Sequence, residues 1–212
     1  MLAEWGADES PVRCVKFCRL PTITELLDAG ERRIRASPEV GLWRPWVARA
    51  DAEDLMQQAL GHPVDDPQQD IGTAARRHFQ RLLARRVSGE PIALIRGSME
   101  FAGLRLVVRP GVFTPRSSSE LLAFEAIRRL KGRRKPFAVD VACGAGAVAL
   151  TVARRVPRAG VLGLDIASAA VALGRHNARR LGLTNVKFST GDLLASLPRR
   201  LEQAVDIFTA HP

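Results

Sequence analysis

The chain has 212 residues, of which 46% are hydrophobic and 25% are charged, a balance that is ordinary for a globular protein with a buried core. No apolar run approaches the ~20 residues that a membrane-spanning helix needs, so we expect no role in a membrane. The three cysteines are too few for a disulfide framework, and Cys14 and Cys18 have no partner at zinc-binding spacing. We therefore expect no metal and a reducing, cytoplasmic location.

The formal net charge of +10 is divided unevenly along the chain. Residues 1–70 carry 13 acidic and 8 basic side chains, whereas residues 71–212 carry 9 acidic and 24 basic ones. A basic segment of this kind is typical of a protein that works close to RNA or the ribosome. The alternative is a coding sequence rich in G and C, which favours arginine over lysine, and the absence of an RNA-binding signature favours that alternative.

Residues 1–20 have no periodicity, and we expect a disordered lead. Three amphipathic helices then follow, starting at Thr22, spanning Ala48–Leu60 and spanning Gly72–Val87. Thr22 and Glu25 have the spacing of a capping box. Residues 21–88 are therefore predicted to form a small helical domain, a packing or substrate-docking module, in which Trp43 and Trp46 serve as core or interface anchors.

Residues 89–116 are predicted to form a linker built on a β-hairpin. Hydrophobic residues alternate at Ile92 and Leu94 and again at Leu104, Leu106 and Val108, and glycines at 97 and 103 bound the connection between the two runs. The run Ser117–Ser119 then precedes an apolar periodic segment that ends at Leu130. Serine suits a helix N-cap, so we expect these side chains to cap that helix.

The stretch from Phe137 to Asp165 predicts a strand (Phe137–Val141), a glycine turn, a helix (Ala147–Arg155) and a second strand (Val161–Leu164). Such a unit presents backbone N–H groups to a ligand at the end of a parallel sheet. We expect Gly144 and Gly146 to leave room for the ligand beside the main chain, and Asp165 to accept hydrogen bonds from a ribose diol. The unit is typical of a site for a nucleoside-like cofactor.

The glycines alone leave the identity of that cofactor open. Gly144, Gly146 and Ala149, with Asp165 further on, also fit the dinucleotide-binding fingerprint. Asp140, four residues before Gly144, favours instead the pattern D-x-x-x-G-x-G. A helix (Ser168–Leu181), a strand (Asn185–Ser189) and Asp192 follow, and a fourth strand (Val205–Ala210) precedes His211. Three aspartates thus follow three successive strands, which places them at one edge of an α/β sheet.

Several spaced motifs resemble those of one family. They are R-x-x-G-E-P-x-A-x-I-x-G (residues 86–97), E-F-x-G-L (residues 100–104) and P-G-V-x-x-P-R-x-x-x-E (residues 110–120). With the D-x-x-x-G-x-G pattern they resemble the protein-(glutamine) methyltransferases, which are class I S-adenosylmethionine-dependent enzymes. The resemblance implies a Rossmann-like α/β domain, S-adenosyl-L-methionine as cofactor, and the glutamine of the GGQ loop of a peptide chain release factor as substrate.

The resemblance also implies roles for individual residues. It assigns cofactor binding to Asp140, Ala142, Gly144, Gly146, Asp165, Ile166, Asp192 and Leu193, and it assigns substrate contacts to Phe101 and Arg116. In the family the fourth strand leads into the catalytic motif N-P-P-Y, and here His211 and Pro212 stand at its first two places. A neutral imidazole has one hydrogen-bond acceptor, so it cannot replace the carboxamide of asparagine, but it can act as a general base toward a different nucleophile.

The expected fold is thus a disordered lead (1–20), a helical domain (21–88), a hairpin linker (89–116) and a Rossmann-like class I methyltransferase domain (117–212). Sheets of that class have seven strands, and only four are predicted here, so we expect the chain to be a fragment truncated after the fourth strand. Two alternatives stay open. One is a methyltransferase that acts on RNA, DNA or a small molecule, and the other is a catalytically inactive module that binds the cofactor.

Overall fold

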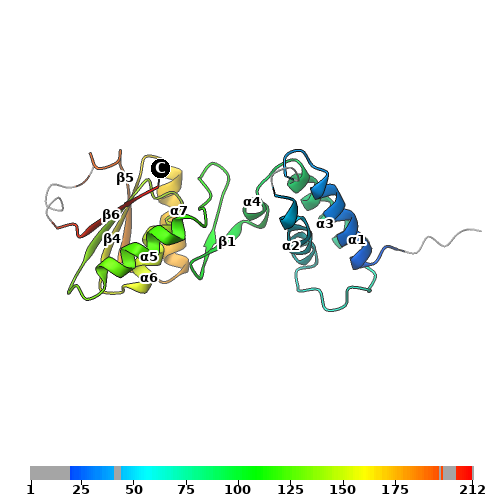
Figure 1. The fold of residues 1–212 in the computed structure, drawn as a ribbon, viewed down its shortest axis with the longest axis horizontal. Coiled ribbons are helices and arrows are strands. Elements are labelled where there is room, and N and C mark those ends of the chain that lie inside the picture. The colour runs from blue at the N-terminus through cyan, green and yellow to red at the C-terminus, as the bar shows by residue number, and fades with distance from the viewer. Residues whose placement is uncertain (1–19, 41–43, 196, 198–203, 212) are drawn as a thin grey trace, which may run out of the picture.

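The computed structural model describes residues 20–40, 44–195, 197 and 204–211. Figure 1 shows a helical lobe and an α/β lobe at opposite ends of the molecule, joined by a short helix and a β-hairpin. Each lobe has its own hydrophobic core. The expected α/β class is therefore confirmed, and the parallel sheet lies in the second half of the chain.

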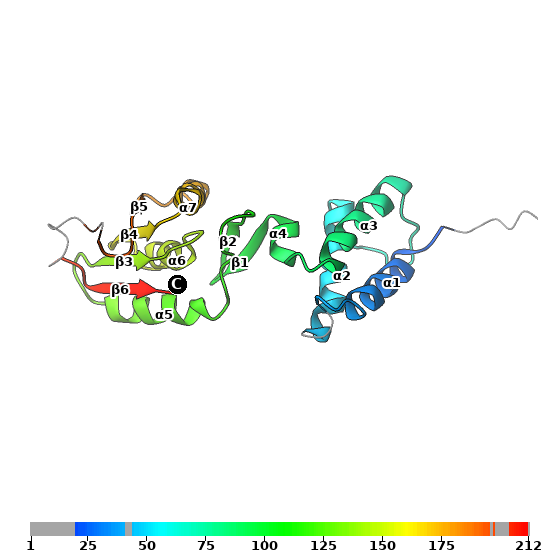
Figure 2. The same cartoon turned by 90° about the horizontal axis from the view of Figure 1, so that it is seen from above.

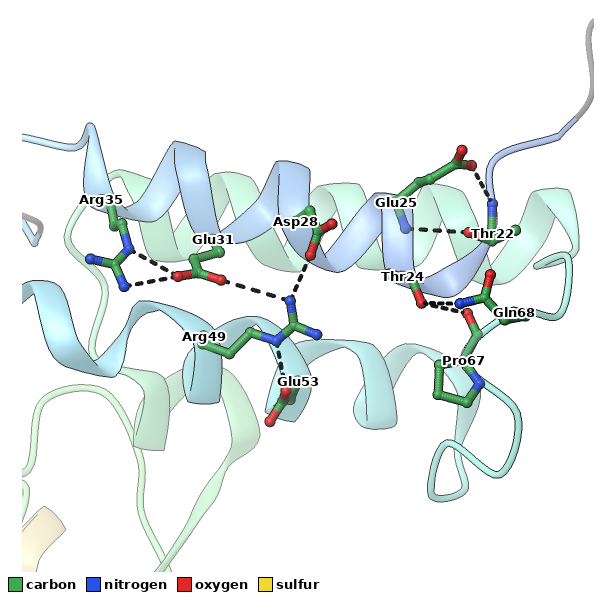
Figure 3. A network of polar contacts seen from close by, with 10 residues as sticks. All are labelled: Thr22, Thr24, Glu25, Asp28, Glu31, Arg35, Arg49, Glu53, Pro67 and Gln68. Atoms are coloured by element: carbon green, nitrogen blue, oxygen red, sulfur yellow. Dashed lines mark hydrogen bonds and ion pairs between the residues drawn. The ribbon is translucent and has the colours of Figure 1, made fainter.

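The helical lobe consists of α1 (Ile23–Arg35), a 3-10 turn at Pro45–Val47, α2 (Ala48–Leu60) and α3 (Thr73–Val87). The predicted capping box starts α1. The Glu25 N–H donates to Oγ1 of Thr22 at 3.3 Å, and the Thr22 N–H donates to Oε2 of Glu25 at 2.9 Å (Figure 3). The first four N–H groups of an α-helix lack partners within the helix, so this reciprocal pair fixes where α1 begins.

Charged side chains hold these helices together on the outside and in the core. On the surface, Arg49 of α2 bridges Asp28 of α1 and Glu53 of its own helix, each at 2.7 Å (Figure 3). In the core, Nε of Arg86 in α3 donates to Oδ2 of Asp51 in α2 at 2.7 Å, and both residues are buried. The buried pair therefore ties α3 to α2 in the interior of the lobe.

One prediction for this lobe is wrong in part. Trp46 lies in the 3-10 turn with 70% of its surface exposed, so it is not a core anchor. Trp43, the other tryptophan expected to be an anchor, lies outside the described residues.

The predicted hairpin is correct only in its second half. Residues Ile92–Arg96 form a short helix, α4, and not a strand. Pro91 precedes the helix, and Gly97, with φ +69°, ends it in the left-handed conformation. Ile92 and Ile95 are three residues apart, so on a helix both reach the core of the helical lobe. That packing overrides the alternation of the sequence.

The hairpin itself pairs β1 (Ser98–Phe101) with β2 (Leu104–Val107) in antiparallel register. Its turn is formed by Ala102 and Gly103, which have φ of +48° and +80°. The buried side chains Phe101, Leu104 and Leu106 belong to the core of the α/β lobe. The segment 89–116 is thus shared, with α4 packed on the helical lobe and the hairpin packed on the α/β lobe.

The α/β lobe is built on a parallel sheet with the order β5-β4-β3-β6. The strands are β3 (Phe137–Val141), β4 (Gly160–Asp165), β5 (Val186–Thr190) and β6 (Ile207–Ala210). The helices α5 (Ser119–Leu130), α6 (Ala147–Arg155) and α7 (Ser168–Arg180) share one hydrophobic cluster with the sheet. Figure 2 shows β6 running alongside α5, with its C-terminal end beside the start of that helix. This arrangement brings residue 211 next to residue 119.

Candidate functional site

A cleft of about 230 Å³ opens at the carboxyl ends of the central strands, where ligands bind in open α/β sheets. It is bounded by the end of β3, the glycine turn that follows, the end of β4, the loop before α5 and the residue after β6. Its lining includes six residues predicted from the sequence, namely Arg116, Asp140, Ala142, Gly144, Asp165 and His211. The sheet topology therefore assembles one site from segments that are up to 98 residues apart in the chain, from Phe113 to His211.

The glycine turn between β3 and α6 is held by backbone hydrogen bonds. The Cys143 N–H donates to the Leu164 carbonyl at 2.9 Å, and the Gly146 N–H donates to the Cys143 carbonyl at 2.8 Å. Gly144 has φ +52°, and a Cβ built on it would meet only the Phe113 carbonyl oxygen, at 3.7 Å. The main chain at Gly144 therefore faces the cleft without a side chain between them, as a close ligand approach requires.

Gly146 is glycine for a different reason from the one expected. It has φ +83°, and an added Cβ would lie 2.7 Å from the ring of Phe188. That contact is inside the hydrophobic core, and Gly146 does not line the cleft. The prediction that its missing side chain leaves room for a ligand is wrong, because the space is taken by a phenylalanine.

Asp165 ends β4 and holds the glycine turn in place. Its Oδ2 accepts a hydrogen bond from the Gly144 N–H at 2.8 Å, and its Oδ1 accepts one from the Ala167 N–H at 2.9 Å. A carboxylate has about four lone-pair sites, so roughly two are left for hydroxyl donors of a ligand. Asp165 is partly exposed at the cleft and can accept such donors without any rearrangement of the turn.

Asp140 is the penultimate residue of β3 and is buried at the base of the strand ends that line the cleft. The hydroxyl of Thr209 donates to its Oδ1 at 2.7 Å, and the Ala149 N–H donates to its Oδ2 at 3.1 Å. Burial raises the pKa of Asp140 to about 7, although both hydrogen bonds act against that shift. A cationic group of a ligand beside this carboxyl would favour its ionised form.

The loop before α5 forms the opposite wall of the cleft. The guanidinium of Arg116 lies over the ring of Phe113, 5.1 Å from its centroid, a distance at which a cation and an aromatic face attract each other. Phe113 is 61% exposed and lines the cleft together with Pro115. Our sequence reasoning missed Phe113. The signal was an aromatic residue inside the turn-forming segment PGVFTPR, where no periodic pattern gives it a core to pack into.

His211 and Ser119 meet in the lining of the cleft, where Nδ1 of the imidazole lies 2.6 Å from the Oγ of the serine. The sequence predicted that Ser117–Ser119 cap α5. That prediction is wrong, because α5 starts at Ser119, and Ser118, the N-cap residue, makes no side-chain capping bond. Ser119 is directed to His211 instead. Pro212, which was expected beside His211 in the catalytic motif, lies outside the described residues.

Four other predicted site residues are not part of this lining. Ile166 and Leu193 are 72% and 57% exposed beyond the cleft, and Asp192 is exposed after β5. Their proposed contacts with a cofactor stay a prediction. Phe101 is fully buried in the core under the hairpin, so the prediction that it touches a substrate is wrong. Phe101 occupies the second place of the motif E-F-x-G-L because its ring packs in the core of the α/β lobe.

Within the part of the chain that the structure describes, no three His, Cys, Asp or Glu side chains gather in a way that would hold a metal ion. None of the described helices is long and apolar enough to cross a membrane.

Residues 137–211 match a family model described as a methyltransferase domain. The chain is 34% identical over 175 residues to a release factor glutamine methyltransferase of Bordetella pertussis, an alignment covering 79% of this chain and 63% of that protein. It is 34% identical over 196 residues to the enzyme of the same name from Moorella thermoacetica, covering 90% of this chain and 66% of that protein.

A third relative carries a different name. The chain is 32% identical over 197 residues to a 4-amino-L-phenylalanine/4-methylamino-L-phenylalanine methyltransferase of Streptomyces pristinaespiralis, an alignment covering 91% of this chain and 65% of that protein. The chain therefore spans slightly less than two thirds of the length of each of these three relatives.

Proposed function

We propose that the chain, whose residues 137–211 match a family model described as a methyltransferase domain, binds S-adenosyl-L-methionine and transfers the methyl group to a nitrogen atom. Two of its relatives are named release factor glutamine methyltransferases, so the acceptor that we propose first is the side-chain amide of a glutamine in a peptide chain release factor. The observation that carries the proposal is the cleft itself, which combines a partly exposed main chain at Gly144 with the carboxyl groups of Asp140 and Asp165.

The residues present fit the cofactor at its polar groups. Asp165 has acceptor capacity for the ribose hydroxyls, and Gly144 has open space for a close approach of the amino-acid part. Asp140 supplies a carboxyl next to which an ammonium group would be stabilised. Asp192 is our candidate for the adenine amino group, by its place after β5. Bound there, the cofactor supplies an electrophilic methyl group on a sulfonium.

The protein's own part in the reaction is to hold the acceptor nitrogen in line with that methyl group. Positioning of this kind accounts for ~7–11 kcal/mol of the barrier in well-oriented reactions. Arg116 and Phe113 line the cleft on the side of the loop before α5, and His211, which follows β6, lines it as well. We infer that these three residues contact the acceptor.

A second acceptor is favoured by His211. A neutral imidazole accepts one hydrogen bond, whereas the two N–H groups of a primary amide call for two acceptors. An aromatic amine has a lone pair that is more available than that of an amide, so a single proton acceptor is sufficient for it. The Streptomyces pristinaespiralis relative, whose alignment includes both lobes of this chain, is named for such a substrate. We therefore propose an aromatic amine as the alternative acceptor.

The test is transfer of isotope-labelled methyl groups from S-adenosyl-L-methionine to three acceptors: a bacterial peptide chain release factor, 4-amino-L-phenylalanine and bulk RNA. Label on the release factor, lost when its GGQ glutamine is changed to alanine, supports the amide proposal. Label on 4-amino-L-phenylalanine alone supports the amine alternative. Label on RNA would indicate that the basic residues 71–212 bind nucleic acid and would contradict both proposals. No label on any acceptor would refute the enzymatic proposal. With a release factor as partner, we expect the protein to act in the cytoplasm.

A further inference from the structure

Ser119 and His211 form a pair that the cofactor does not explain. The Ser119 side chain is buried at the first residue of α5, and its Oγ lies 2.6 Å from Nδ1 of His211. This is a short contact for a hydrogen bond between a nitrogen and an oxygen atom, which usually spans about 2.7–3.2 Å. Both residues line the same cleft as Asp140 and Asp165, so the pair is part of the site and not of the distant surface.

The fold holds Ser119 firmly in that place. The Ser119 N–H donates to the Arg116 carbonyl at 2.9 Å, and α5 packs along β6, the strand that delivers His211 (Figure 2). Next to the pair, Thr209 of β6 donates to the buried Asp140 at 2.7 Å, which fixes the end of that strand. The two partners are therefore positioned by separate elements, and their meeting is set by the packing of α5 against the sheet.

We propose that Ser119 is a positioning residue, which accepts a hydrogen bond from the Nδ1–H of His211 and so leaves the lone pair of Nε2 facing the cleft as a proton acceptor. A serine hydroxyl accepts as well as donates, and a neutral imidazole carries its proton on one nitrogen only. Fixing the proton on Nδ1 makes Nε2 the base. This inference rests on the proposed methyltransferase function and adds a proton path to it.

The step that Nε2 serves is the loss of a proton from the acceptor. The acceptor nitrogen forms a bond to the methyl carbon while the carbon–sulfur bond breaks, and the bonding electron pair stays on sulfur. The nitrogen thereby gains a positive charge and releases one proton, which passes to Nε2 of His211. The resulting imidazolium keeps its Nδ1–H bond to Ser119. A group that takes a proton in this way contributes ~10²–10⁴-fold to a rate.

The charged groups around the imidazole come from three elements. Arg116 lies in the loop before α5, Asp140 at the end of β3 and Asp165 at the end of β4, and all three line the cleft with His211. A change in the pH dependence of kcat is therefore assigned to His211 only by comparison with a variant that leaves these three charged groups intact. Ser119→Ala is such a variant, because it removes a neutral hydroxyl.

The direct test is the tautomer of His211, read by two-bond ¹H–¹⁵N correlation on the full chain labelled with ¹⁵N-histidine. The chain has four histidines, and the signals of His211 are identified by their loss in His211→Asn. We expect a protonated Nδ1 and an unprotonated Nε2 at neutral pH. In Ser119→Ala we expect the proton to shift toward Nε2, the tautomer that free histidine favours. A protonated Nε2 in the unchanged protein, or an unchanged tautomer in Ser119→Ala, would overturn the inference.

The second readout is kinetic. Ser119→Ala should lower kcat by ~10-fold and leave the affinity for S-adenosyl-L-methionine within ~2-fold, because the serine acts through His211 and not on the cofactor. Ser119→Thr keeps the hydroxyl and should retain activity. Ser118→Ala is the matched control, since that serine is exposed and makes no capping bond. A shared loss in both alanine variants would point to α5 as a whole and contradict the specific role of Ser119.

The two readouts separate this inference from the function on which it rests. The tautomer is measured without cofactor or acceptor. An Nδ1–H imidazole together with no methyl transfer to any acceptor would refute the proposed function. Methyl transfer with an unchanged rate in Ser119→Ala would leave the function standing and refute the proton path.

Discussion

The substitution Gly163→Ala should destabilise the α/β lobe, because Gly163 forms part of a socket for the ring of Phe188. A Cβ on Gly163 in β4 would lie 2.5 Å from the ring and 3.1 Å from the sulfur of Cys143, and neither neighbour is the free end of a flexible chain. Overpacking a core costs about 1–3 kcal/mol, and removing a strand glycine returns about 0.5–1 kcal/mol. We expect a net loss of about 1–2 kcal/mol in the free energy of unfolding.

Urea denaturation followed by far-UV circular dichroism measures this loss. Gly72→Ala is the matched control, because Gly72 has φ −60° and an added Cβ would meet nothing within 4 Å, so we expect a change below about 1 kcal/mol. In a Phe188→Leu background the ring atoms that the Cβ meets are absent, so the same substitution should cost less by at least ~0.5 kcal/mol. An equal cost of Gly163→Ala in both backgrounds would refute the socket.

Two further predictions concern buried carboxyl groups. Asp51→Ala leaves the buried guanidinium of Arg86 unpaired and should lower the free energy of unfolding, measured by urea denaturation, by about 3 kcal/mol. The control Asp54→Ala breaks a more exposed pair with Arg96 and should lower it by less than about 1 kcal/mol. Similar losses in the two variants would contradict a stabilising role for the buried pair. The pKa of Asp140 is about 7 in the native protein against its ordinary 3.8, so the native state binds more protons than the unfolded one between these values. The free energy of unfolding should therefore fall as pH rises from about 4 to about 7. Thermal unfolding measured across this pH range should show a smaller fall in Asp140→Asn. An identical pH dependence in both proteins would show that Asp140 titrates normally.

The sequence predicted the central elements well where one physical signal dominates. The strand Phe137–Val141 and the helix Ala147–Arg155 agree with the structure residue for residue, because an apolar run, a glycine turn and a helical periodicity follow one another without conflict. The capping box at Thr22 was equally clear, since two side chains at fixed spacing satisfy two backbone donors.

The errors arose where tertiary contacts decide between local alternatives. The segment Ile92–Arg96 alternates as a strand does, but the core of the helical lobe selects a helix for it. Gly146 and Phe101 were placed at the site because they belong to motifs, yet both serve the core. The partner of Ser119 lies 92 residues away, and only the sheet order β3-β6 with α5 beside β6 brings His211 to it. No local pattern contains that contact.

The most direct measurement for the central claim is calorimetric titration of the full chain with S-adenosyl-L-methionine, compared with Asp165→Ala. We expect one binding site, and a loss of at least ~10-fold in affinity when the carboxylate that holds Gly144, and that we propose binds the ribose, is removed. Glu125→Ala, which breaks a surface ion pair on α5, should bind as the unchanged protein does. A folded protein that gives no heat of binding, or an Asp165→Ala variant with undiminished affinity, would contradict the assignment of this cleft as the methyl-donor site.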